Sequence, residues 1–198
     1  MVNKIKETLR EKSRDNLTNT LIKIGINAQM AERGLEQEKI GDEWYTKKLG
    51  IINVQDQPIK WINICKKPPS KDSPPNWKYI FIVPDERLVS GKDKVKIKTI
   101  RKKSFPIFGK VIVTTWIGND RSGLAHTLSN DIEIKSLAKS IGDIHLESFS
   151  DPIPGWFLRV GHTQHLDGQS NWHNRITMET WEQLRKLSEH LLSTPRIL

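Results

Sequence analysis

The alternation of apolar and polar residues predicts most of the secondary structure of this 198-residue chain. Short apolar segments that are separated by turn residues are typical of β-strands. Five such segments precede residue 120 and two more follow residue 142. We predict strands over 43–54, 59–65, 77–83, 94–100, 111–117, 143–149 and 156–160.

Apolar residues spaced three and four apart predict helices over 3–34, 131–141 and 177–193. Short turns between consecutive strands favour antiparallel pairing. We therefore expect an α+β fold, in which a mainly antiparallel sheet of about six or seven strands packs against the helices. The helices are a long N-terminal one, a short internal one and a C-terminal amphipathic one.

The length of the chain fits one domain with an appended arm. We expect residues 1–36 to form a helical arm and residues 37–198 to form a single α+β domain. The arm would pack on the sheet or pair with a second copy of the chain, which would give a homo-oligomer. No apolar run approaches the roughly 20 residues of a membrane span, and Cys65 is the only cysteine. We expect a cytoplasmic protein without a membrane partner.

Two predicted strands have contrasting patterns. Every residue of 111–117 is apolar or β-branched, which is typical of a strand covered on both faces, so we place it in the middle of the sheet. In 94–100, by contrast, Lys94, Lys96 and Lys98 alternate with apolar and small residues and share one face. This lysine row is either a surface for an anionic partner or the protection of an edge strand.

Positive charge is concentrated in one quarter of the chain. The net charge is +9, and residues 60–110 alone contain fourteen basic and four acidic residues. Such a concentration favours an anionic partner, with nucleic acid as the leading candidate. The residues that we expect to contact phosphates are Lys94, Lys96, Lys98, Arg101, Lys102 and Lys103.

Aromatic residues are interspersed among these lysines. If they were exposed, they would stack on the bases of a single-stranded nucleic acid, and otherwise they form the core. One exposed tryptophan on the face of Lys94, Lys96 and Lys98 would favour the nucleic-acid interpretation. The aromatic residues concerned are Trp61, Trp77, Tyr79 and Phe81.

A second hypothesis is a Mg²⁺-dependent nuclease of the restriction-endonuclease type. Such enzymes hold the metal with two carboxylates and place a lysine beside the attacking water. Asp120, Glu133 and Lys135 have the corresponding order and spacing, with Asp131 as an alternative carboxylate. The predicted helix over 131–141 would place Glu133 and Lys135 on different faces. Magnesium is expected as a cofactor only under this hypothesis.

Two further groups of polar residues could bind ligands. His162, His165 and Asp167 lie in a polar segment without periodicity, and their imidazole and carboxylate groups are suitable Zn²⁺ ligands. The turn Asn119, Asp120 and Arg121 follows a predicted strand and could contact an anionic ligand.

Taken together, these patterns favour a non-enzymatic binding protein that uses the basic surface formed by residues 60–110 for an anionic partner. The alternatives are the magnesium-dependent nuclease and a scaffold or oligomerising protein built through the N-terminal helix.

Overall fold

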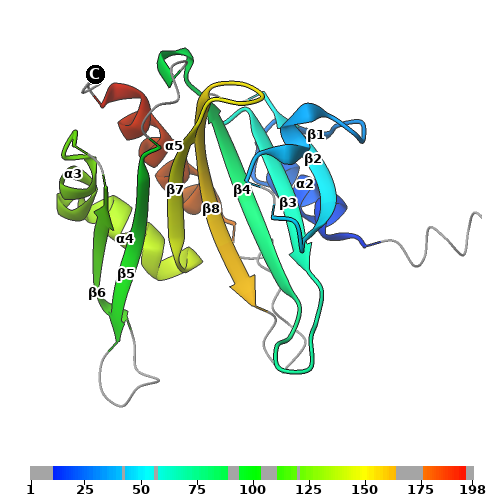
Figure 1. Ribbon diagram of the computed structural model, residues 1–198, viewed down its shortest axis with the longest axis horizontal. Helices are drawn as coiled ribbons and strands as arrows, with labels where there is room; N and C mark the ends of the chain where they lie inside the picture. Colours follow the sequence, from blue (N-terminus) through cyan, green and yellow to red (C-terminus); the bar gives the residue numbers. More distant parts are fainter. Residues whose placement is uncertain are drawn as a thin grey trace, which may run out of the picture.

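The structure is a computed structural model that describes residues 11–41, 43–55, 58–88, 94–103, 111–119, 121–163 and 176–194. One eight-stranded antiparallel sheet forms its centre, with four α-helices in the described ranges (Figure 1). The α+β fold and its terminal helices agree with the sequence prediction. The strand order is β1-β2-β3-β4-β8-β7-β5-β6. None of the described helices is long and apolar enough to cross a membrane.

The strands are β1 (Ala28–Met30), β2 (Lys47–Val54), β3 (Trp61–Lys67), β4 (Asn76–Pro84), β5 (Lys96–Lys103), β6 (Val111–Gly118), β7 (Ile144–Phe149) and β8 (Gly155–Thr163). The α-helices are α2 (Ser13–Lys23), α3 (Leu124–Asn130), α4 (Ile132–Ile141) and α5 (Met178–Ser193). Two short 3₁₀ helices, η1 (Glu36–Lys39) and η2 (Glu86–Leu88), complete the described elements.

The helices cover one face of the sheet and bury the main hydrophobic core against it, as the layering in Figure 1 shows. Alternation along each strand sends every second side chain into this core. Along β4, Tyr79 and Phe81 point into the core, and Phe81 contacts Trp181 of α5 with ring centroids 6.4 Å apart. Lys78 and Ile80 of β4 therefore point to the opposite face.

Among the described residues, that opposite face has a smaller buried apolar cluster, in which Ile40 packs against Cys65, Ile80, Ile82 and Phe157. The Nδ2 atom of buried Asn63 donates hydrogen bonds to the carbonyls of Glu38 and Ile40, which holds η1 over this part of the sheet. We call the part of this sheet face that lies outside the cluster the open face. Its side chains include Lys78, Ile100, Val113, Ile117, His145, Arg159, Lys96, Lys98 and Lys102.

The prediction of one helix over 3–34 is wrong over its second half. Helix α2 ends at Lys23, because Gly25 adopts a φ of +89° that a continuing helix does not allow. The chain then forms β1, which pairs with β2. Leu17 and Leu21 of α2 are fully buried in the main core. The expected boundary at residue 36 and the pairing of this segment with a second copy stay predictions.

The placement of 111–117 in the middle of the sheet is also wrong. Strand β6 is an edge strand, and its side chains alternate between buried Trp116 and exposed Ile117. Strand β5 is not an edge, since it pairs with β6 and with β7, although its predicted alternation is correct. β-Branched residues tolerate half-exposed positions as well as buried ones, so composition alone misleads here.

The edge of β6 is closed at one position by a side chain from α3, a helix that the sequence pattern did not reveal. The Ser129 Oγ accepts a hydrogen bond from the Trp116 amide at 2.9 Å and donates one to the Trp116 carbonyl at 3.3 Å. The next helix, α4, begins where predicted, because the Asp131 side chain accepts from the amides of Glu133 and Ile134.

Asp85 ties the C-terminal end of α5 to the sheet. Its buried carboxylate accepts hydrogen bonds from the Arg87 guanidinium at 2.8 Å and from the Trp156 indole N–H at 3.1 Å. Arg87 in turn donates to the carbonyls of Leu191 and Thr194. These bonds hold the pKa of Asp85 below its ordinary value, although burial alone would raise it.

Asp85→Ala should lower the free energy of unfolding by about 2 kcal/mol, because it leaves a buried indole N–H and a guanidinium without their acceptor. Urea denaturation at neutral pH measures this value. Asp72→Ala, in an exposed loop, is the matched control and should change stability little. Equal stability of the two variants would contradict the role of Asp85.

Candidate nucleic-acid interface

A row of cationic and titratable side chains crosses the middle of the open face. The strand register places Arg159 of β8 opposite His145 of β7, and His145 opposite Lys98 of β5. Adjacent strands lie about 4.8 Å apart, so these side chains are close neighbours. Lys78, on β4, lies next to Arg159 because both bind the same carboxylate. We call Lys78, Arg159, His145 and Lys98 the basic row.

One carboxylate serves two members of the basic row. Glu43 Oε1 accepts a hydrogen bond from Arg159 Nη1 at 2.7 Å, and Oε2 accepts one from Lys78 Nζ. Partial burial favours the neutral form of Glu43, but the hydrogen bonds from Lys78 and Tyr45 outweigh it and lower the pKa of Glu43. At neutral pH Glu43 is therefore charged and neutralises only part of the row.

The surroundings of His145, unlike those of Glu43, disfavour its charged form. Its imidazole is half-buried, and desolvation is the main reason that the pKa of His145 lies below its ordinary value. The positive charges of Arg159, Lys98 and Lys78 lower it further, against a weaker opposing effect of Asp143. Lys98 forms no ion pair with any described residue. The charge of Lys98, at the β5 end of the row, is thus not neutralised by an ion pair with a described residue.

Two aromatic side chains adjoin the basic row. The turn Glu43–Thr46 is closed by a hydrogen bond from the Thr46 amide to the Glu43 carbonyl at 2.8 Å, so Trp44 and Tyr45 occupy its central positions. The Tyr45 ring contacts Lys78 Nζ at 5.3 Å and Lys67 Nζ at 5.7 Å from its centroid. Trp44 is 96% exposed and touches Tyr45 edge to face, with centroids 5.5 Å apart.

The aromatic residues that the sequence analysis considered have other roles. Tyr79 and Phe81 are buried in the main core. Trp61 and Trp77 are half-buried and pack against the two apolar clusters. The exposed tryptophan beside the lysines is Trp44, which we had placed in a strand. In the sequence, the turn residues Gly41 and Asp42 shortly before Trp44 were the signal that this segment could belong to a turn.

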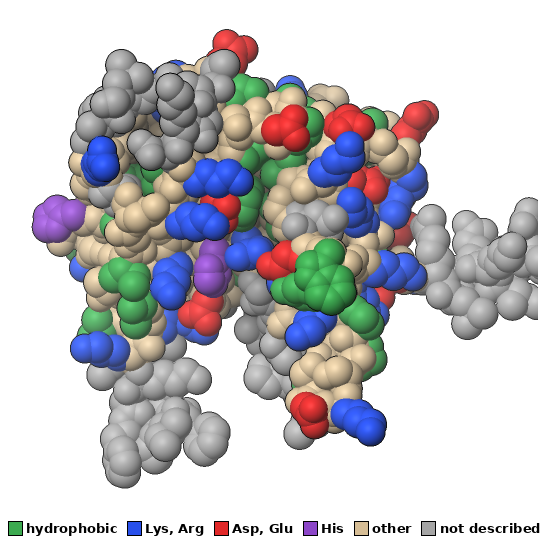
Figure 2. Space-filling model, in the orientation of Figure 1, with side chains coloured by type: hydrophobic (Ala, Val, Ile, Leu, Met, Phe, Trp, Pro, Cys, Tyr) green, Lys and Arg blue, Asp and Glu red, His purple; other side chains and the backbone are tan. Residues whose placement is uncertain are grey.

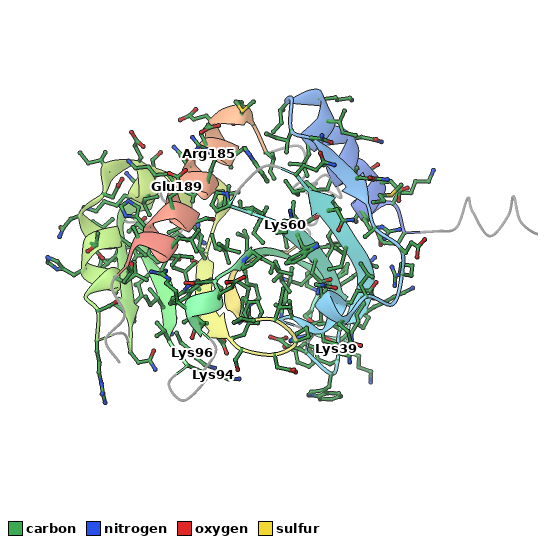
Figure 3. The ribbon with its side chains drawn as sticks, turned by 90° about the horizontal axis from the view of Figure 1, so that it is seen from above. Lys39, Lys60, Lys94, Lys96, Arg185 and Glu189 are labelled. Atoms are coloured by element: carbon green, nitrogen blue, oxygen red, sulfur yellow. The ribbon has the colours of Figure 1, made fainter. Side chains whose placement is uncertain are left out.

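An open pocket of about 400 Å³ adjoins the row, with Lys94, Lys96 and Arg159 among its cationic side chains and Phe149 and Phe157 among its apolar ones. Figure 3 shows Lys39, Lys94 and Lys96 on one side of the sheet, and Arg185 and Glu189 on the helical side. Figure 2 views the open face directly and shows lysine and arginine side chains gathered over its middle.

Apolar side chains lie at the β5–β6 end of the same face. Ile100, Val113 and Ile117 are 42%, 45% and 40% exposed, respectively. Ile117 lies directly opposite Lys98, and Val113 opposite Lys102. The basic row therefore runs between the Trp44–Tyr45 pair at one end and an apolar patch at the other.

Most of the predicted phosphate-contacting residues lie on the open face. Lys94, Lys96, Lys98 and Lys102 are exposed there, and Lys96 forms an ion pair with Glu147 at 3.2 Å. Arg101 alternates to the other face, where its guanidinium binds Asp143 at 2.6 Å. Lys103 belongs to β5, but its side chain lies outside the described residues. Sequence reasoning did not identify Lys78, His145 or Arg159, since cross-strand register brings them together.

The residues of the nuclease hypothesis are only partly described. Glu133 and Lys135 lie in the first turns of α4, and Glu133 forms an ion pair with Lys186 of α5 at 2.7 Å. Asp131 caps α4 and binds Lys186 and His190, each at 3.2 Å. Asp120 lies outside the described residues. Within the described ranges, no group of three or more His, Cys, Asp and Glu side chains is arranged to hold a metal ion.

The structure describes only part of the predicted ligand turn and of the predicted zinc site. Asn119 uses its side-chain amide to bind β5, accepting from the Lys96 amide at 2.6 Å and donating to the Lys94 carbonyl at 3.1 Å. Arg121 is exposed. His162 belongs to β8, but its side chain lies outside the described part, as do His165 and Asp167. These ligand and zinc sites stay predictions.

Comparisons with protein-family models, with curated proteins and with solved structures found no match to this chain. Its function is therefore inferred from the chemistry of its own surface.

The surroundings of His145 predict how stability depends on pH. Since the pKa of His145 is lower in the folded protein than the ordinary value of 6.5, the unfolded chain binds more protons as the pH falls through 6.5. Stability should therefore decrease from pH 7 towards pH 5, and His145→Gln should reduce this decrease. Urea denaturation across this range measures it. His126→Gln, at an exposed position of α3, is the control. If His145→Gln had the same pH dependence as the wild type, the interpretation would be wrong.

Proposed function

We propose that this protein binds nucleic acid through the open face, without catalysing a reaction on it. The observation that carries the proposal is the basic row, in which Arg159, His145 and Lys98 occupy facing positions on three adjacent strands. Because its lowered pKa leaves His145 neutral at pH 7, the charges of the row are those of Lys78, Arg159 and Lys98. A polyanion lying along the row would contact cations on three different strands, so the row favours a ligand with repeated negative charges.

The surrounding charges support the same partner. Lys94, Lys96 and Lys102 extend the positive surface along β5, and Lys67 extends it beside Tyr45. The carboxylates nearest to them, Glu43 and Glu147, are engaged in ion pairs. Lys94, Lys98 and Lys102 form no ion pair with a described residue, so they offer their charges to phosphates beside the two aromatic rings. This combination is suited to binding rather than to acid–base chemistry.

A salt titration tests the proposal. Binding of fluorescently labelled oligonucleotides, measured by anisotropy, should weaken with salt with a log–log slope of about −3, as expected for four or five contacted phosphates of a single strand. Lys98→Ala should weaken binding and make the slope shallower by about 0.7. Lys139→Ala removes the same charge from the exposed surface of α4 and is the matched control.

Two results would overturn the proposal: no binding to any oligonucleotide at low salt, or equal losses in Lys98→Ala and Lys139→Ala. The second would mean that net charge, and not the open face, determines the affinity.

Glu43 provides an independent prediction with the opposite sign. Its carboxylate neutralises Lys78 and Arg159, two of the cations that a phosphate would contact. Glu43→Gln should therefore strengthen oligonucleotide binding severalfold at low salt, measured in the same titration. Glu179→Gln, exposed on α5, changes the net charge equally and should have a smaller effect. Weaker binding by Glu43→Gln would contradict the place given to phosphates on the row.

A further inference from the structure

The turn Glu43–Thr46 presents Trp44 beside the basic row, and the residues on both sides of it are anchored there. Glu43 binds Arg159 and Lys78, and the Tyr45 ring contacts Lys67 and Lys78. Trp44 itself contacts the Tyr45 edge and is otherwise exposed to solvent. A single exposed apolar side chain is ordinary, but here the planar ring extends from a turn whose flanking residues contact several cations.

We infer that the nucleic acid bound by this protein is single-stranded, with a base stacked on Trp44 and phosphates along Lys78, Arg159 and Lys98. The inference rests on the proposed function. Stacking on an aromatic ring requires a base whose flat face is free, which a single strand offers and a duplex conceals within its own stack. A duplex would use the cations of the open face and leave Trp44 unused.

The dimensions of the open face agree with a short single strand. From the β4 position opposite Arg159 to Lys98 on β5 the path crosses β8 and β7, about 14 Å for three strand spacings, and Lys78 lies two residues, about 7 Å, further along β4. The path runs across the strands, from the Trp44–Tyr45 pair to the exposed Ile117 and its apolar neighbours. The surface thus offers apolar contacts for bases at both ends and cations for phosphates between them.

The occupant that competes with this interpretation is an acidic protein segment. Its carboxylates would also bind the basic row, without any contact to Trp44. A protein segment has no stacked bases, so its affinity would not depend on a planar ring at position 44 and would be matched by poly-glutamate. This difference separates the two partners.

The test compares labelled oligonucleotides of about 12 nucleotides, within the range of known single-strand sites, with the duplex of the same sequence at one salt concentration. Wild-type protein should bind the single strand at least about tenfold more tightly than the duplex. Trp44→Ala should weaken single-strand binding by about tenfold, leave the salt slope unchanged and leave duplex binding unchanged. Trp44→Phe, which keeps a planar ring, should retain most of the affinity.

Ile132→Ala is the matched control, since Ile132 of α4 is 82% exposed on the helical side. It should bind both nucleic acids like the wild type. Because Trp44 is almost fully exposed, Trp44→Ala should unfold at the same urea concentration as the wild type, so a loss of binding would not reflect a loss of fold.

The outcomes separate this inference from the proposed function. Equal affinity for single strand and duplex, or full binding by Trp44→Ala while Lys98→Ala is impaired, overturns the single-strand inference and leaves the nucleic-acid proposal standing. Equally strong binding of poly-glutamate, insensitive to Trp44→Ala, indicates an acidic protein partner and overturns it too. No binding of any oligonucleotide at low salt overturns both.

Discussion

Every strand of this sheet has one side chain in two pointing away from the helices, and that alternation organises the whole molecule. Because the described helices lie on one face, the apolar half of each strand is buried beneath them. The other half must remain compatible with water, except where η1 covers it. Core formation and the display of charge are therefore two results of one strand geometry, and a register shift by one residue would exchange them.

The positive charges of the open face are only partly neutralised by its carboxylates. Burial of half of His145 and the packing of Lys78 and Arg159 around a single carboxylate all limit how far water can screen the row. The large core on the helical face stabilises the fold despite the positive charges of the row, because the residues of the row contribute little to that core.

The sequence predicts elements better than it predicts neighbours. Strict alternation in 94–100 and the start of α4 close to residue 131 are local features, and both agree with the structure. The position of β6 at the sheet edge depends on pairing between segments far apart in sequence, which composition does not encode. The same holds for the basic row, because Lys98, His145 and Arg159 meet only through the pairing of β5, β7 and β8. Trp44 was missed for a local reason: aromatic residues favour strands, and here the turn Glu43–Thr46 overrides that preference.

The hydroxyl group of Ser129 limits how far the sheet can be extended beyond β6. By donating to and accepting from the same residue of β6, it occupies the two backbone groups that another strand would need at Trp116. Sheet extension is blocked at that point by a single oxygen atom from a helix. At Trp116 the open face therefore ends with β6, because no strand of another chain can pair with the backbone there.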